Sequence, residues 1–114
     1  MAETAATKAT ALCAIAARLA ANHYEVTLND VGAPTRRSRR ATRARHVAMY
    51  LAHVAYGLRL AEIAIAFGRS RRSVARACSL IEDARDDPAF DAALEGLEIS
   101  ARVLHDLERE KKAA

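Results

Sequence analysis

Gly68 separates two short segments in which apolar residues recur at the spacing of a helix. In residues 60–67, Ile63 and Phe67 fall on one face, and glycine can take the positive φ that ends a helix tightly. Ser70 is a suitable N-cap for the next helix, because its hydroxyl can accept a hydrogen bond from a first-turn N–H. The sequence therefore predicts two helices joined by a tight turn. The apolar stripe of the second helix, which spans about 100° of a helical wheel, consists of Val74, Ala77, Cys78 and Ile81.

The N-terminal part of the chain predicts one helix followed by a loop. In residues 4–21, Leu12, Ile15 and Leu19 recur at spacings of three and four, and their alanine-rich neighbours favour a helix. Residues 23–35 end in turn-forming residues. We therefore expect a loop there, with one short helical turn around residues 27–31.

Two further helices are expected, one before the pair joined at Gly68 and one after it. The later helix begins after Asp86 and Asp87, because acidic residues followed by proline are typical of a helix N-terminus. The earlier one is a core helix that begins near Arg43 and stops at Gly57. Its stripe consists of Val47, Leu51, Val54 and Leu58.

A chain of 114 residues with 52% apolar residues can bury one core but has little room for a second. We therefore expect a single domain over residues 1–114 with an all-α fold. Residues 1–35 would form an N-terminal helix and loop, residues 36–87 a basic loop and a helix-turn-helix, and residues 88–114 a C-terminal helix with a frayed tail.

The basic charge of the chain is concentrated in its middle. Residues 1–35 sum to −1, residues 36–76 to +10 and residues 77–114 to −5. Fifteen of the eighteen basic residues are arginine, whose planar guanidinium suits bidentate contacts to phosphate or guanine. This asymmetry is expected of a nucleic-acid footprint rather than of a uniformly solubilised surface.

The charge and the tight turn together predict a helix-turn-helix that binds double-stranded DNA. In this motif the second helix enters the major groove and the first helix braces it. Residues 36–45 hold six arginines and no acid, a self-repelling segment that phosphates or a narrow minor groove would relieve. The spacing predicts that the second helix contacts DNA through Ser70, Arg71, Arg72 and Arg76, and the upstream segment through Arg36, Arg37, Arg39, Arg40, Arg43 and Arg45.

The stretch ARHVAMYLAH, followed by GLRLAEIAIAFGRSRRSVARACSLIED, resembles the C-terminal DNA-binding domain of the bacterial replication initiator DnaA. It is also similar to small stand-alone proteins of alphaproteobacteria that contain only that domain. The resemblance covers residues 24–87 and implies that a basic loop enters the minor groove while a helix-turn-helix reads the major groove. By position, it implies that Arg37, or alternatively Arg36, is the minor-groove arginine. It further implies that Arg39 and Arg45 hold phosphates. The reading end of the second helix, which is the end that contacts the bases, would consist of Arg69, Arg71, Arg72 and Ser73.

The reading end departs from the initiator's pattern. Where that pattern has an acidic residue, a histidine and two threonines, this chain has Ser70, Arg71, Arg72 and Ser73, and Arg76 replaces a later histidine. Bidentate arginine prefers guanine, whereas threonine methyl groups favour thymine, so we expect a different DNA site. The chain also lacks a Gly-rich phosphate loop, which argues against an initiator.

These features predict a sequence-specific transcription regulator. Some of the small relatives activate prophage-like gene transfer agent clusters, and the resemblance offers this as a specific role. Two alternatives stay open. One is an architectural protein that coats DNA without sequence preference, and the other is a modulator of replication initiation that acts through a protein partner.

The C-terminal helix has two apolar stripes, which allow two interpretations. Either both belong to one wide buried face, or one stripe faces RNA polymerase, another regulatory protein or a second copy of the chain. The resemblance favours a monomer, because the resembling domain needs no dimer to bind DNA. The first stripe consists of Phe90, Leu94, Leu97 and Ala101, and the second of Ile99, Val103 and Leu107.

Other reactive side chains do not form a recognisable site in the sequence. Cys13 and Cys78 lie far apart without ligand spacing, which predicts buried thiols rather than a metal site or a disulfide. His46 and His53 lie seven residues apart on one helix face, and a partly buried or DNA-proximal role explains them better than a ligand pair. No segment reaches the roughly 18 apolar residues of a membrane span. We therefore expect a cytoplasmic, nucleoid-associated protein that is not an enzyme, with no cofactor, no metal, no membrane association and no small-molecule substrate.

Overall fold

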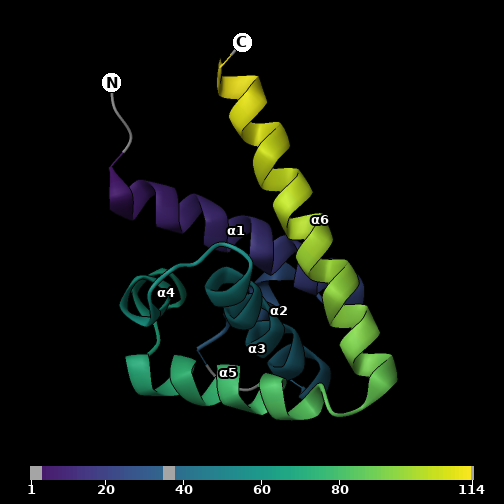
Figure 1. Cartoon of the computed structure of the whole chain (residues 1–114). Coiled ribbons are helices and arrows are strands. Elements are labelled where there is room, and N and C mark those ends of the chain that lie inside the picture. Colours follow the sequence, from purple (N-terminus) through teal and green to yellow (C-terminus); the bar gives the residue numbers. More distant parts are fainter. Residues whose placement is uncertain (1–3, 35–37, 114) are drawn as a thin grey trace.

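The computed structural model describes residues 4–34 and 38–113, which form six helices and no strand (Figure 1). The predicted all-α fold is therefore confirmed. The short helix expected around residues 27–31 is present, with the Thr27 side chain accepting a hydrogen bond from the Asp30 N–H at 3.0 Å. The helices are α1 (Ala5–Tyr24), α2 (Leu28–Gly32), α3 (Arg39–Val54), α4 (Leu60–Phe67), α5 (Arg71–Ala84) and α6 (Pro88–Ala113).

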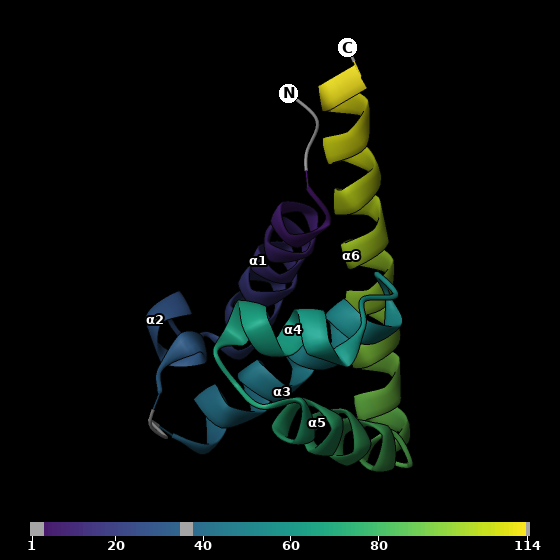
Figure 2. The same ribbon diagram turned by 90° about the vertical axis from the view of Figure 1, so that its left-hand side faces the viewer.

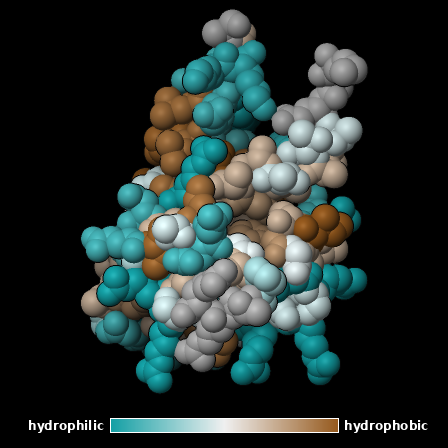
Figure 3. Space-filling view, turned by 180° about the vertical axis from the view of Figure 1, so that it is seen from behind, coloured by the Kyte–Doolittle hydropathy of each residue, from teal (hydrophilic) through white to brown (hydrophobic). Residues whose placement is uncertain are grey.

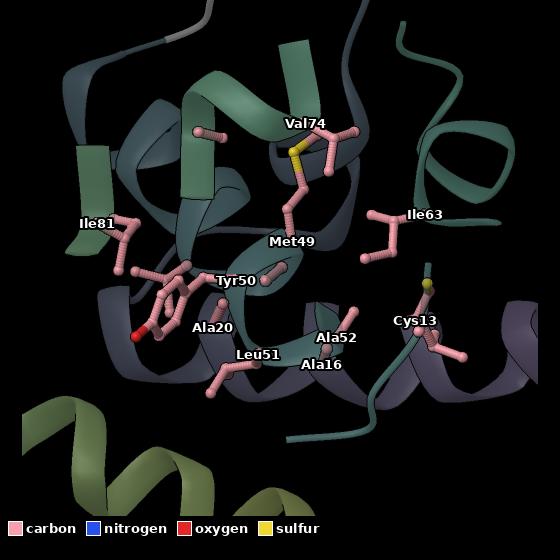
Figure 4. Packing of buried hydrophobic residues seen from close by; sticks show 14 of the residues in the cluster. Cys13, Ala16, Ala20, Met49, Tyr50, Leu51, Ala52, Ile63, Val74 and Ile81 are labelled. Atoms are coloured by element: carbon pink, nitrogen blue, oxygen red, sulfur yellow. The ribbon is translucent and has the colours of Figure 1, made fainter. Parts of the chain in front are cut away.

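The central element is α3, which contacts each of the other five helices. Six consecutive residues of α3, from Val47 to Ala52, are buried, so this stretch of the helix has no solvent-facing side. Met49 points toward Val74 of α5, and Leu51 and Ala52 lie on the side of α1 (Figure 4). Such a helix is apolar all round because every face packs against another element.

The contact between α1 and α3 is made largely by alanine. Ala16 and Ala20 of α1 are fully buried, as are Ala44, Ala48 and Ala52 of α3. The sequence pattern had indicated a face formed by Leu12, Ile15 and Leu19. Of these only Leu12 is buried, while Ile15 and Leu19 are half-buried at the edge of the core. The alanine side faces α3 because side chains without atoms beyond Cβ let two helix backbones approach closely.

The predicted tight turn joins α4 to α5. Gly68 has φ +63° and ψ +38°, and its N–H donates to the carbonyls of Ala64 and Ile65. The Arg69 N–H donates to the Ala64 carbonyl at 2.9 Å, so two carbonyls in the last turn of α4 have partners in the turn. The predicted stripe of α5 is confirmed, since Val74, Ala77 and Ile81 are buried and Cys78 is half-buried.

The end of α3 differs from the sequence-based expectation. The helix ends at Val54 instead of Gly57, and Val54 is exposed although it had been placed on the core stripe. Gly57 lies in the following turn with φ +66°. The chain leaves the helical path there so that Leu58 is buried, and a 2.8 Å hydrogen bond between His53 Nδ1 and the Leu58 carbonyl holds the turn.

A polar cluster connects α3, α5 and α6 around Arg85. The Arg85 guanidinium donates to Asp91 at 2.5 Å, to Glu98 and to the Tyr50 hydroxyl at 3.0 Å. Tyr50 in turn donates to Glu82 at 2.5 Å. Burial lowers the pKa of Arg85, but the hydrogen bonds to Asp91, Glu98 and Tyr50 outweigh it, so the pKa lies above its usual value. A fixed cation pairs here with carboxylates from α6, which sets how α6 leaves α5.

The start of α6 has the predicted acidic cap. Pro88 is the first helical residue, and a carboxylate oxygen of Asp87 accepts a hydrogen bond from the Phe90 N–H at 3.3 Å. The segment for which fraying was expected belongs to the helix, which runs to Ala113. The first stripe of α6 packs on the body, with Leu94, Leu97 and Ala101 buried, while the second stripe is exposed. The two stripes therefore do not form one wide buried face.

The molecule has two distinct ends. The start of α1 and the end of α6 lie at one end, and α5 crosses the opposite end with α4 next to it (Figures 1 and 2). Among the residues that the structure describes, no helix is long and apolar enough to cross a bilayer. Both cysteines are free, and burial raises the pKa of each thiol to about 11, with a smaller effect of Glu62 on Cys13.

Ala16→Leu tests the close approach of α1 and α3. Three additional carbon atoms at a fully buried position should lower the free energy of unfolding by about 1–3 kcal/mol, because the backbones would have to separate. The measurement is urea denaturation followed by circular dichroism. Ala14→Leu is the matched control, since Ala14 lies on the exposed side of the same helix. Equal stability of the two variants would contradict the packing described above.

Gly68→Ala tests the turn. Alanine at φ +63° is strained even though no neighbouring atom would meet its Cβ, so we expect the free energy of unfolding to fall by about 1–2 kcal/mol.

Gly96→Ala should have the opposite effect, because Gly96 lies inside α6 with open space around the added Cβ. At low protein concentration it should raise stability by about 0.5–1 kcal/mol. Thermal melts of the two variants should therefore shift in opposite directions.

Candidate nucleic-acid interface

The N-terminal ends of α3 and α5 are built in the same way. Each helix is capped by a serine whose hydroxyl oxygen accepts a hydrogen bond from a first-turn N–H at 3.0 Å, Ser38 from Ala41 and Ser70 from Ser73. Each cap is followed by two exposed arginines, and neither first turn contains an acidic residue. These pairs are Arg39 with Arg40 and Arg71 with Arg72.

This arrangement is electrostatically unfavourable without an anion. A helix N-terminus carries roughly half a positive charge and prefers acidic residues, as α4 and α6 show with Glu62 and Asp91 in their first turns. Adding two guanidinium groups at each of two N-termini increases the positive potential there. Backbone N–H groups and arginines that converge in this way form an attractive site for phosphates.

A pocket of about 190 Å³ between α3 and α5 brings the two predicted groups of DNA-contacting residues together. Its α3 side carries Arg45 and His46, and its α5 side carries Ser73 and Arg76, with Arg69 at the turn. Three arginines from segments more than twenty residues apart thus line one small depression. A phosphate oxygen is the acceptor that suits such a set of donors.

A second pocket, of about 280 Å³, lies beside the first. It is lined by Arg39, Thr42, Arg43 and His46 of α3 and by Leu80 of α5. The Arg43 guanidinium lies over the Phe90 ring at 5.0 Å from the ring centroid, which ties this arginine to the start of α6. The Thr42 hydroxyl is buried and makes no hydrogen bond within the described residues.

His46 lies between the two pockets and contributes to both. Burial lowers its pKa, and the positive charges of Arg45, Arg43 and Arg76 lower it further. The imidazole is therefore held neutral among cations, and a phosphate placed next to it would oppose this shift. The sequence had indicated only a partly buried or DNA-proximal role for His46. Its position three and seven residues after Arg43 and Arg39, on the same side of α3, was the available signal.

Arg45 and Arg69 also bind the chain itself. Arg45 is only 8% exposed and donates to the Val31 carbonyl at 3.4 Å, while Arg69 donates to the Ala33 carbonyl. Both carbonyls belong to the end of α2, where helical hydrogen bonds are lacking. Burial and the charge of Arg69 lower the pKa of Arg45. These two arginines thus fix the chain where it enters the basic segment, in addition to lining the first pocket.

Most of the remaining predicted residues are exposed, and two lie outside the described residues. Arg36 and Arg37, including the expected minor-groove arginine, lie outside the described residues. His53 does not join the interface, since it bonds to the Leu58 carbonyl in the α3–α4 turn. Arg43 is half-buried, and the exposed predicted residues are Arg39, Arg40, Ser70, Arg71, Arg72, Ser73 and Arg76.

The outer side of α5 changes charge along its length. Arg72 and Arg76 lie opposite the buried side of the helix, whereas Glu82 and Asp83 are exposed near its end. In the space-filling view, hydrophilic side chains project from the end of the molecule at which α5 lies (Figure 3). Only the first two turns of α5 are therefore suited to approach a polyanion, and its last turn would be repelled by one.

The comparison with known proteins agrees with this arrangement. Residues 15–81 match the family model described as the bacterial DnaA protein helix-turn-helix, which is more than half of the chain. The matched segment contains α3, α4 and most of α5, and it ends before α6. No curated protein and no solved structure gives a significant match. The family supports DNA as the partner of this protein. The chain belongs to the bacterial DnaA protein helix-turn-helix family.

Proposed function

We propose that this protein is a sequence-specific double-stranded DNA-binding regulator of transcription. The observation that carries the proposal is the arginine-lined surface between α3 and α5, two helices that each begin with a serine cap and two exposed arginines. One of them begins the second helix of a helix-turn-helix, the element that reads base edges in proteins with this motif. The other begins within the basic segment, residues 36–45, for which phosphate or minor-groove contact is expected.

The dimensions of α5 suit the major groove. An α-helix with its side chains is about 10–12 Å wide, and the major groove is about 12 Å wide. The change from arginine to acidic residues along α5 favours entry by its N-terminal end. Arg69, Ser70, Arg71, Arg72, Ser73 and Arg76 then lie nearest to the bases, while Glu82 and Asp83 stay away from the phosphates.

We propose a regulator rather than an architectural protein that coats DNA, because arginines at the reading end of α5 can distinguish one base from another. A bidentate arginine–guanine contact contributes about 1–3 kcal/mol of discrimination against the wrong base. The resemblance to small stand-alone relatives extends the proposal to activation of prophage-like or gene transfer agent genes. We further propose that the protein acts by binding and has no catalytic activity of its own.

Replacing Arg71 and Arg72 by alanine tests the reading end. We expect discrete promoter peaks in genome-wide immunoprecipitation for the unmodified protein and loss of those peaks in the double variant. Lys8→Ala with Arg18→Ala is the matched control, because it removes the same charge from exposed positions of α1. Broad signal for the unmodified protein would favour an architectural role. Peaks that persist in the Arg71/Arg72 variant would instead favour regulation through a partner.

The affinity for the site found in this way should also fall steeply with salt. With about four to six phosphate contacts, the logarithm of the binding constant should fall with the logarithm of salt concentration at a slope of roughly −4 to −5. Fluorescence anisotropy with a labelled duplex measures this slope. A nearly flat response would contradict a phosphate-binding interface.

His46 should make DNA binding dependent on pH. In the free protein its pKa lies below the ordinary value of about 6.5, and nearby phosphates would raise it in the complex. Binding would then take up a proton, so the affinity should increase as the pH falls through the range between these two pKa values. His46→Gln should lose this dependence, while His53→Gln should keep it. The same pH dependence in the His46→Gln variant and the unmodified protein would show that no phosphate lies near His46.

A further inference from the structure

The second stripe of α6 is exposed in the structure, and the family match does not extend to this helix. Ile99, Val103 and Leu107 are 56%, 50% and 54% exposed. Leu104 borders them, so four of the eight exposed large apolar residues in the described chain belong to this one helix. The space-filling view shows a hydrophobic patch over the upper part of α6, away from α5 (Figure 3). A contiguous exposed apolar patch on a small protein is typical of an interaction surface.

Gly96 continues the same stripe one turn earlier. It lies inside α6, takes no positive φ, and a Cβ added there would meet no atom within 4 Å. Glycine in a helix interior is destabilising relative to alanine, and nothing in the described chain requires its small size. A second helix that approached closely over this stripe would require it.

The charges beside the stripe complement one another when the helix pairs with a copy of itself. At 3.6 residues per turn, Glu95, Arg102, Asp106 and Arg109 fall within about 60° of one another along one edge of the stripe. Their signs alternate along this edge. Glu95 and Arg109 have no ion pair among the described residues, and Arg102 has only a 3.8 Å contact to Glu98.

In an antiparallel pair centred on Val103, like edges of the two helices meet. Ile99 then lies across from Leu107 of the second copy, because both are four residues from the centre. Glu95 lies across from Arg109 of the second copy, and Arg102 lies between Asp106 and Arg102 of the second copy. The two-fold symmetry gives four pairs of opposite charge and one pair of like charge, so attraction prevails. Each of these charge pairs is offset by two residues, or about 3 Å along the axis. The apolar stripe and its charged edge are thus self-complementary, as a two-fold interface requires.

We propose that the exposed stripe of α6 is a dimer interface in which the α6 helices of two copies pack antiparallel around Val103. This differs from the monomer that the resemblance favours. The interface lies away from α5, so both DNA-binding ends stay accessible in the dimer (Figures 1 and 2). Dimerisation does not depend on DNA binding and is tested without DNA.

Sedimentation equilibrium of the full chain, from about 1 μM to about 1 mM, tests this proposal. We expect the mass to rise to twice that of one chain, and Val103→Asp to keep the mass of one chain throughout. Ile65→Asp is the matched control, because it makes the same kind of change at an exposed residue of α4 and should leave the dimer intact. Thermal melts by circular dichroism show whether each variant is folded. A single-chain mass for the unmodified protein at every concentration, or a dimer of folded Val103→Asp, would overturn the proposal.

A charge exchange distinguishes antiparallel pairing from other modes of association. Glu95→Arg and Arg109→Glu each place like charges across the interface, so each should weaken the dimer. The double variant restores opposite charges and should recover most of the dimer affinity. If the double variant were weaker than both single variants, the two residues would not face each other and the antiparallel arrangement would be wrong.

Discussion

The close contact between α1 and α3 is the interaction on which the rest of the structure depends. Because alanines line it on both sides, the two helices can approach closely enough to bury residues 47–52 of α3. Dispersion contacts are individually weak but numerous in such an interface, and they vanish quickly when backbones move apart. With α3 fixed in this way, α4 and α5 pack on its other faces. Arg45 of α3 then lines one pocket with residues of α5, and Arg39 and Arg43 line a second pocket with Leu80.

Two kinds of electrostatic environment follow from this packing. Around Arg85, a cation is matched by carboxylates and a tyrosine hydroxyl, so the charges are satisfied within the chain and fix the orientation of α6. At the N-terminal ends of α3 and α5, cations accumulate next to positive helix ends with no acidic residue in either first turn. The first arrangement stabilises the fold. The second makes the electrostatic potential of one surface more positive, so that this surface attracts an external anion. The positions of the acidic residues, rather than of the arginines, distinguish the two.

The two ends of the molecule are suited to different tasks. The family match covers the helices that build the basic end and stops before α6. The α6 helix runs from the end at which α5 lies to the opposite end, and its exposed apolar stripe lies away from α5. The Arg85 cluster and the bond from the Tyr56 hydroxyl to the Ala101 carbonyl, at 2.8 Å, attach α6 firmly to the body. A partner bound along α6 would therefore be held in a defined position relative to the basic surface. A dimer that holds two DNA-binding units in a fixed arrangement requires this geometry.

The sequence by itself determined the local features of this protein. Helical spacing, Gly68 and Ser70 specified the turn and the buried side of α5, because a positive φ and a cap depend on one or two residues. The concentration of arginine and the reading-end residues were also evident without coordinates. Only the tertiary structure decided which side of α1 faces α3, where α3 ends, and that the second stripe of α6 stays exposed, because these depend on how closely distant helices approach. It also brought His46 between two groups of arginines and gave Arg45 and Arg69 a second role at the end of α2. Contacts between residues that lie far apart in the chain depend on the packing of whole helices, which no short pattern records.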